Sequence, residues 1–367
     1  MALSKSSRRD LGQKKATRRA LWVSTSLSTH GGIATYVRNM RGTTLWLEWD
    51  IHHIATHCNG SALARLVIFL KGLGRFVYEL SRQRVSVVHI HTSSYGSFAR
   101  KSILTWISAL FQVPVILHVH GSEFHQFFEK VPKPAKLFIR ATLERADAVI
   151  ALGEIWARRL ELIAPDANIA VVPNAIRLSP VVDQSDRDPI HVLFLGEVCE
   201  RKGTFLLLES WARLFENCPS AQARLSIVGN GDNERAHSII NKLGIRDCVE
   251  VRGWLSPSEV QGLLANTQIL VLPSLNEGQP MAILEAMARG ICVVASNSGG
   301  IPEMLGDASG ILVDPLEVTY LTQAIERVIT DHEARHLVGT AARERIEKHF
   351  NIDIVCRQLD SLYHDVS

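Results

Sequence analysis

Short apolar runs alternate with longer amphipathic segments along most of this chain. The runs are rich in Val, Ile and Leu and are bounded by Gly, Pro or polar residues, a pattern typical of buried parallel strands. They fall at residues 19–24, 85–91, 115–120, 146–152, 190–195, 225–228, 249–254, 269–272, 291–295 and 310–315. The segments between them repeat apolar residues at helical spacing. The pattern therefore predicts an α/β protein with two parallel sheets, each covered by helices on both faces.

One segment, residues 102–122, contains no Asp, Glu, Lys or Arg and approaches the length that spans a bilayer. Pro114, His118 and His120 interrupt it, and a Gln-Val-Pro turn divides it. We therefore expect a helix followed by a buried strand here, not a membrane span.

The stretch 273–289 carries the clearest candidate chemistry. The apolar run 269–272 leads into a polar turn that contains Glu277, and Pro280 suits the first helical position because its missing N–H costs nothing there. Glu277 is then expected in the loop after a strand, and Glu285 in the next helix. Open α/β sheets bind ligands in that crevice, where two carboxylates can accept hydrogen bonds from the hydroxyls of a sugar and a ribose.

Two glycine-rich loops follow predicted strands. Gly31-Gly32 follows the first strand and precedes a helix, and Gly229 and Gly231 follow the strand at 225–228. Backbone N–H groups in such loops can bind a diphosphate, although a plain tight turn is the alternative for the first loop. That loop is not a Walker P-loop, because no Gly-Lys-Ser/Thr follows it.

The spacing of Glu277 and Glu285 resembles the E-x7-E motif of retaining glycosyltransferases of family 4, which have the GT-B fold. In that family the first Glu contacts the donor sugar and the second contacts the nucleotide ribose. His120-Gly-Ser-Glu is similar to the family's His-Gly-Ser/Thr-Asp/Glu element, whose His lies against the donor sugar. Lys202 matches the Lys of its Gly-Arg-x-x-x-x-Lys-Gly segment, in which Arg and Lys bind the donor diphosphate.

The resemblance implies a set of site residues. Spacing alone leaves open whether His118 or His120 faces the cleft, and the motif favours His120. The implied catalytic residues are His120, Glu277 and Lys202. The implied donor-binding residues are Gly31, Gly32, Arg201, Lys202, Gly229, Gly231, Glu277, Gly278, Gln279, Pro280, Met281, Ala282 and Glu285.

One position departs from the family's pattern. Glu197 stands where the family has the diphosphate-binding Arg, which reverses the charge. Either Arg201, beside Lys202, takes over that contact, or Glu197 faces away from the donor. If neither holds, the chain is a catalytically weak scaffold of the same fold.

The charge of the chain is unevenly distributed. The net charge is only +3, but residues 1–178 hold 24 Lys and Arg against 11 Asp and Glu, and residues 179–367 hold 16 against 26. A basic half suggests an anionic neighbour, such as a membrane surface or a lipid-linked phosphate, although segregation of charge between domains is the simpler alternative. The same alternatives apply to the basic amphipathic helix expected at 62–83, which could lie on a membrane or only cover the sheet. We expect no nucleic-acid partner, because the aromatic residues are expected to be mostly buried.

No metal site or cofactor is expected. Asp186-Arg187-Asp188 matches D-x-D, the metal-diphosphate motif of the other glycosyltransferase fold. In that fold the motif stands at the end of an apolar strand, whereas here it precedes one. The six cysteines are scattered without a C-x-x-C pair, which is typical of reduced cytosolic thiols. No secretory signal is recognisable at the start, so a cytoplasmic protein is expected, with peripheral contact to the cytoplasmic membrane face as a further possibility.

The expected organisation is a GT-B pair of Rossmann-like domains that face each other across a cleft. A basic flexible tail at 1–19 precedes an acceptor-side domain at 20–178. A linker at 179–189 leads to a donor-side domain at 190–350, and a helix at 351–367 packs back on the first domain.

The implied function is retaining, metal-independent transfer of a sugar from a UDP- or GDP-sugar to an acceptor hydroxyl. A lipid-linked or surface-polysaccharide glycan, as in exopolysaccharide or lipopolysaccharide assembly, is the favoured acceptor, with a soluble acceptor as the competitor. A nucleotide-sugar 2-epimerase and a scaffold without strong activity are the alternative functions.

Overall fold

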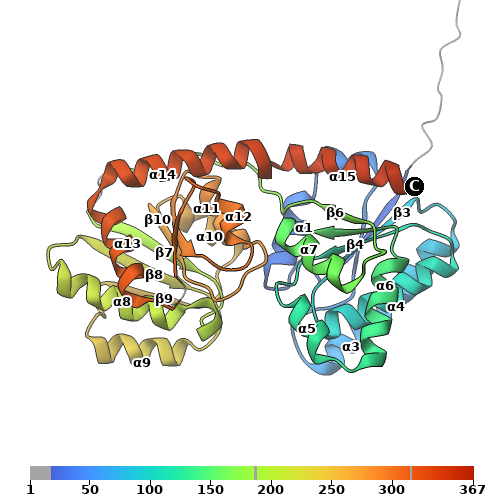
Figure 1. The fold of residues 1–367 in the computed structure, drawn as a ribbon, viewed down its shortest axis with the longest axis horizontal. Coiled ribbons are helices and arrows are strands. Elements are labelled where there is room, and N and C mark those ends of the chain that lie inside the picture. The colour runs from blue at the N-terminus through green and yellow to red at the C-terminus, as the bar shows by residue number, and fades with distance from the viewer. Residues whose placement is uncertain (1–17, 186–187, 315) are drawn as a thin grey trace, which may run out of the picture.

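The computed structural model describes residues 18–185, 188–314 and 316–367. They form two α/β domains side by side, bridged along one edge by the last helices of the chain (Figure 1). Each domain is built on a six-stranded sheet, in the order β2-β1-β3-β4-β5-β6 in the first and β12-β11-β10-β7-β8-β9 in the second. All the strand pairs are parallel, so the predicted α/β class with two parallel sheets is confirmed. The predicted tail lies, up to residue 17, outside the described residues.

The elements of the first domain are β1 (Ala20–Ser24), α1 (Gly32–Met40), α2 (Thr44–Glu48), β2 (His52–Ala55), α3 (Ala62–Ser81), β3 (Val87–Thr92), α4 (Gly96–Leu110), β4 (Val115–Val119), α5 (Phe124–Lys130), α6 (Lys133–Arg145), β5 (Ala148–Ala151), α7 (Glu154–Ile163) and β6 (Ile169–Val171). Those after it are β7 (Ile190–Leu195), a 3-10 turn (Glu200–Lys202), α8 (Thr204–Asn217), β8 (Ala223–Val228), α9 (Asn233–Leu243), β9 (Val249–Arg252), α10 (Pro257–Leu264), β10 (Ile269–Leu272), α11 (Met281–Met287), β11 (Cys292–Ser296), α12 (Ile301–Leu305), β12 (Ile311–Val313), α13 (Val318–Thr330), α14 (His332–Arg345), a π-helical turn (Ile346–Phe350) and α15 (Ile352–Val366).

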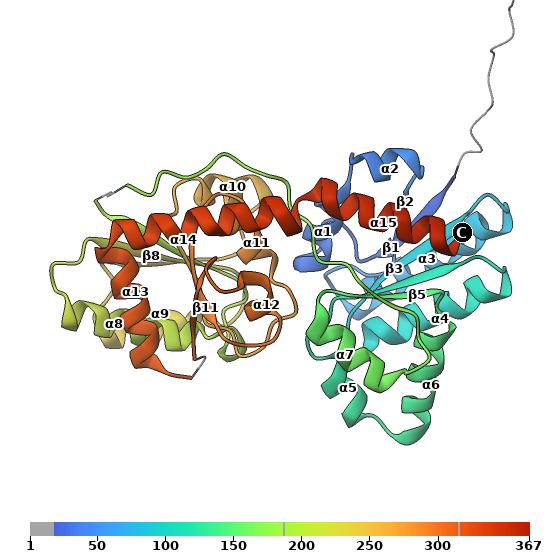
Figure 2. The same ribbon diagram turned by 45° about the horizontal axis from the view of Figure 1, so that its top comes forward.

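The first sheet separates two apolar cores, because successive side chains of a strand point to opposite faces. In β1, Trp22 packs with Tyr36 of α1, whereas Leu21 and Val23 pack with Phe76 of α3. Helices α3 to α7 therefore cover one face, and α1, α2 and α15 cover the other (Figure 2).

The uncharged segment 102–122 folds as expected. It contains the end of α4, a turn and all of β4, both elements of the first domain. In the part of the chain that the structure describes, no helix combines the length and the hydropathy that crossing a bilayer requires.

The chain ends in helices that bridge the domains. Helices α13 and α14 are separated at Asp331, whose side chain accepts a hydrogen bond from Ala334 N and caps the start of α14. The following α15 crosses to the first domain, where Trp49 Nε1 donates to Asp360 Oδ1 at 2.7 Å.

The segment between the domains lies along the second one. Val182 N donates to the Arg289 carbonyl at 2.8 Å, and Arg343 Nη1 donates to the Ser179 carbonyl at 2.6 Å. These bonds hold residues 179–185 against α14 and the end of α11. Of the D-x-D sequence, Asp186 and Arg187 lie outside the described residues.

Candidate active site

A cavity of about 840 Å³ lies between the two domains. Loops that follow β1, β3 and β4 line it from the first domain, and loops that follow β7, β8 and β10 line it from the second. The carboxyl ends of parallel strands share one edge of a sheet, so these loops converge although they are far apart in the sequence.

The structure brings nearly all of the predicted site residues to this cavity. The lining includes Gly31, Gly32, His120, Arg201, Lys202, Gly229, Glu277, Gly278, Gln279, Pro280, Met281, Ala282 and Glu285. Gly231 is the exception, because it does not belong to the lining. Gly231 has a φ of 136°, and a Cβ there would lie 2.3 Å from the Val198 carbonyl oxygen. A glycine at this position therefore lets the loop pass close to the segment that follows β7.

Lys202 and Glu277 meet on the second-domain side of the cavity. Lys202 ends the 3-10 turn after β7, Glu277 follows β10, and the ammonium is ion-paired with Glu277 Oε1. Both side chains are mostly buried, at 16% and 9% exposure. The arrangement places one cation and one hydrogen-bond acceptor side by side, as a phosphate linked to a sugar requires.

Glu285 lies on the buried face of α11 and lines the same cavity. Burial raises the pKa of its carboxyl to about 7, against the opposing effect of Arg289 and Arg38. A carboxyl group whose pKa lies near neutral pH and which lines a cleft is typical of functional sites.

Pro280 is not the first helical residue, so that prediction is wrong by one position. Its ψ of 123° is extended, and its carbonyl accepts hydrogen bonds from Ile283 N and Leu284 N, which makes it the N-cap of α11. The preceding loop determines this, because Gln279 is tied to the first domain by a bond from its Nε2 to the Leu152 carbonyl at 3.1 Å.

Glu197 does not face away from the cleft. It belongs to the cavity lining, its side chain is 61% exposed, and it lies 3.5 Å from Arg201 Nη2. Arg201 also lines the cavity, so the alternative in which Glu197 faces away is wrong, and the takeover of the contact by Arg201 stays a prediction. The pair offsets part of the positive charge that Arg201 brings to the cavity.

Four imidazoles pack between β3, β4 and α1. His120 lines the cavity, whereas His118 is completely buried behind it and stacks on His120 with ring centroids 4.1 Å apart. His91 Nδ1 lies 3.0 Å from His120 Nε2. Burial lowers the pKa of His120 to about 3, so its ring is neutral at physiological pH.

Helix α15 joins these rings in a chain of hydrogen bonds through Tyr363. Trp22 Nε1 donates to the Tyr363 hydroxyl at 2.7 Å, and the same hydroxyl lies 2.5 Å from His89 Nδ1. His89 Nε2 in turn lies 3.1 Å from His118 Nδ1, so both ring nitrogens of His89 have hydrogen-bond partners. This chain of bonds was not predictable, because Tyr363 is remote in sequence.

His89, His91 and His118 also form the one group in the described residues with the spacing of a metal site, their nitrogens all lying within 4.8 Å of one another. The fit to a metal is poor, because both nitrogens of His89 already have hydrogen-bond partners. The absence of a metal remains a prediction.

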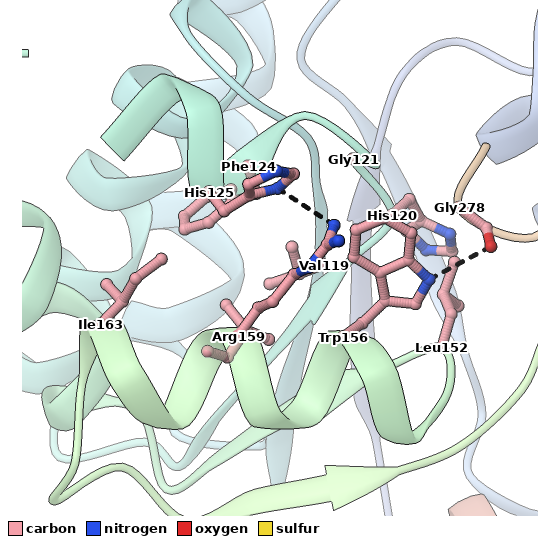
Figure 3. A pocket seen from close by; sticks show the side chains of 11 residues that line it. Val119, His120, Gly121, Phe124, His125, Leu152, Trp156, Arg159, Ile163 and Gly278 are labelled. Atoms are coloured by element: carbon pink, nitrogen blue, oxygen red, sulfur yellow. Dashed lines mark hydrogen bonds between the residues drawn. The ribbon is translucent and has the colours of Figure 1, made fainter. Parts of the chain in front are cut away.

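The loop that carries Glu277 docks directly on the first domain. Trp156 Nε1 of α7 donates to the Gly278 carbonyl at 3.2 Å, beside His120 and Leu152 (Figure 3). Glu303, at the start of α12, accepts hydrogen bonds from Glu154 N at 2.7 Å and from Ile155 N at 3.3 Å. The role of Trp156 could not be predicted from the pattern, because a Trp at helical spacing is usually a core residue.

The lining residues outside the predicted site set include His30, Trp254 and Tyr95. His30 stacks on Trp254 with ring centroids 3.8 Å apart, which joins the first-domain glycine loop to the end of β9. Tyr95 has a φ of 55° at the N-terminus of α4, in the left-handed region that a bulky residue rarely adopts. Backbone strain of this kind concentrates at ligand-binding positions.

The comparisons with known proteins follow the same division of the chain. Residues 178–345 match the family described as Glycosyl transferases group 1, and residues 4–175 match the Glycosyl transferase 4-like domain. The putative colanic acid biosynthesis glycosyltransferase WcaL of Escherichia coli K12 is 32% identical over 59% of this chain and 56% of its own length. The Escherichia coli UDP-Gal:alpha-D-GlcNAc-diphosphoundecaprenol alpha-1,3-galactosyltransferase is 24% identical over 82% of this chain and 81% of its own.

Solved structures share the fold. Anabaena Alr3699/HepE in complex with UDP-glucose aligns with a TM-score of 0.75 and 17% identity, over 95% of this chain and 100% of that one. Sucrose-phosphate synthase from Thermosynechococcus elongatus aligns with a TM-score of 0.75 and 19% identity, over 95% and 98% of the two chains. The match to WcaL spans little more than half of that relative, 56% of its length.

Proposed function

This chain belongs to the group 1 glycosyltransferases with the GT-B fold, and we propose that it transfers a sugar from a nucleoside-diphosphate sugar to an acceptor hydroxyl. The proposal includes retention of the anomeric configuration and no requirement for a metal. The observation that carries it is the convergence of Lys202, Glu277 and Glu285 on one interdomain cavity, opposite the Gly31-Gly32 loop.

In this proposal the second domain binds the donor. Lys202 and the backbone N–H groups of Gly31-Gly32 stabilise the charge that develops on the leaving diphosphate. Glu277 accepts hydrogen bonds from the hydroxyls of the donor sugar, and Glu285 accepts them from the ribose. Contact of the Gly278 loop with the first domain excludes water and limits hydrolysis of the donor.

His120 is a hydrogen-bonding group and not the base. A pKa near 3 makes its imidazole a poor proton acceptor at neutral pH, whereas the neutral ring can still donate from one nitrogen. A phosphate oxygen of the leaving diphosphate then takes the proton of the acceptor hydroxyl. This keeps the incoming hydroxyl on the face that the leaving group vacates, as retention requires.

The acceptor in this proposal is a lipid-linked glycan. The diphosphoundecaprenol galactosyltransferase named above acts on such an acceptor, and WcaL is named for colanic acid biosynthesis. The first domain offers Ser93, Ser94 and the strained Tyr95 to the cavity, on the side opposite Lys202. A UDP-sugar is the first donor to test, because HepE binds UDP-glucose.

The proposal is tested by thermal shift with UDP, GDP, ADP and their common sugars, each with and without EDTA. A ligand at about 100 times its dissociation constant stabilises the folded state by about 2.7 kcal/mol. One nucleotide should give a shift that EDTA leaves unchanged, that Glu285→Ala abolishes and that the exposed control Glu209→Gln retains.

The other outcomes are equally specific. An absence of any shift would refute donor binding and favour a scaffold, with Glu197 as the disabling residue. A shift that EDTA removes would refute the metal-independent mechanism, and a donor epimerised at C2 without transfer would identify an epimerase.

A further inference from the structure

Three neighbouring helices on the face of the first sheet opposite α15 expose apolar side chains to solvent. Helix α4 packs between α3 and α6, and Trp106 Nε1 of α4 donates to Thr142 Oγ1 of α6 at 3.1 Å. We call the exposed apolar residues of these helices and of the α4 C-cap the apolar face. It consists of Leu63, Leu66, Val67, Leu70, Tyr78, Ile103, Trp106, Leu110, Phe111, Leu137 and Phe138.

Helix α3 shows that this face is not the edge of the core. Phe76 and Leu80 are fully buried against the sheet, as a covering helix requires. Leu63, Leu66 and Leu70 lie on its solvent side, at 70%, 52% and 54% exposure, and they recur at a spacing of three and four residues. A helix that is apolar on both sides has one side without a partner.

The charge around this face has one sign. The three helices carry nine Lys and Arg against two Asp and Glu, and of the nine only Lys101 is buried. One of the two acids, Glu79, lies 3.6 Å from Arg19 in an ion pair and is only 12% exposed. Arg65, Lys71 and Lys133 are exposed beside the apolar side chains.

We propose that the apolar face docks on a bilayer that contains anionic lipids. Apolar side chains enter the interface while flanking Lys and Arg contact lipid phosphates, which together give stable surface binding. A second copy of this chain fits less well, because pairing the same face twice would oppose its positive charges.

The position of the face matches the proposed acceptor, and in that respect the inference rests on the proposed function. Tyr95 lines the cavity, and α4 begins at the next residue. At a rise of about 1.5 Å per residue, Trp106 lies roughly 17 Å along the helix from Tyr95. A polyprenyl chain in the bilayer could then present its linked glycan to the first-domain side of the cavity.

The test is flotation of the full chain with vesicles of phosphatidylcholine, alone or mixed with phosphatidylglycerol, without donor or acceptor. We expect flotation with the anionic vesicles, weaker flotation at high salt, and a loss of about tenfold or more in the variant Leu66→Asp/Leu70→Asp. Leu162→Asp on α7 and Leu337→Asp on α14 are the matched controls, at 81% and 68% exposure, and should float as the parent does.

Three results would overturn the proposal. The first is that the parent does not float. The second is that the double variant floats as well as the parent, which would assign binding to another region. The third is a dimer in solution that the double variant dissociates. Nucleotide thermal shifts on the same variants separate the two hypotheses. If the chain floats but binds no nucleotide, the docking face is supported and the proposed glycosyltransferase activity is refuted.

Discussion

Glu285 is held where its charge is costly, and replacing it should stabilise the protein in a pH-dependent way. Burial raises the pKa of this carboxyl from 4.5 to about 7, and the residue is only 9% exposed. Each unit of pKa shift corresponds to about 1.4 kcal/mol, so the ionised carboxylate destabilises the folded state by roughly 3 kcal/mol.

The direction with pH follows from proton binding. Between pH 4.5 and about 7 the folded state holds the proton that the unfolded state has lost, so stability falls as the pH rises through this window. The full cost is present above about pH 7 and is absent well below 4.5. Glu285→Gln removes the ionisable group and should remove the cost.

Thermal unfolding of the parent and of Glu285→Gln at about pH 5 and about pH 8 measures the effect. We expect the variant to melt roughly 5–10 °C higher at the alkaline pH and to show a much smaller gain at the acidic one. Glu209→Gln, on an exposed position of α8, is the control and should change little at either pH. A gain that is independent of pH, or a destabilised Glu285→Gln, would show that burial of the charge is not the cause.

Three other substitutions probe the site. Lys202→Met should lower kcat by about 10²–10³, because it removes a cation from the leaving diphosphate, and it should also lower the melting temperature, because it leaves the buried Glu277 carboxylate unpaired; unaltered turnover in steady-state assays would refute the first role. Glu197→Gln should tighten nucleotide binding about fivefold at low salt and less at high salt, since it frees Arg201 from its ion pair; calorimetry that shows weaker binding would contradict this. Gly229→Ala should destabilise the fold by about 1–3 kcal/mol or more, because the φ is +154° and the new Cβ would lie 1.8 Å from the Gly196 carbonyl oxygen; an unchanged urea midpoint would exclude the clash.

The pattern of the chain was sufficient for the class of fold and for most of the candidate site. Lys202 follows β7 and Glu277 follows β10, and these strands are neighbours in the second sheet. Residues placed after neighbouring parallel strands meet at one edge of the sheet whatever their separation in sequence. A periodic pattern with loops at the strand ends therefore contains enough information to bring them together.

Side-chain direction and ion pairing depended on contacts between distant elements. Alternation along β4 puts His118 and His120 on the same face, so it could not tell which ring reaches the cavity. Glu197 lies beside Arg201, and Pro280 became a cap because its loop is fixed to the first domain. No local pattern records these contacts.

What the sequence determined by itself was the alternation of most of the strands and helices, because hydrophobic periodicity is a local property that each segment carries within it; the short strands β2 and β6 were not predicted. What only the tertiary structure decided was the surroundings of each functional group. The bond between Tyr363 and His89 joins residues 274 positions apart, across a helix that returns from the second domain to the first. Such a partner is specified by the packing of the whole chain, so it appears only when the two domains are in place.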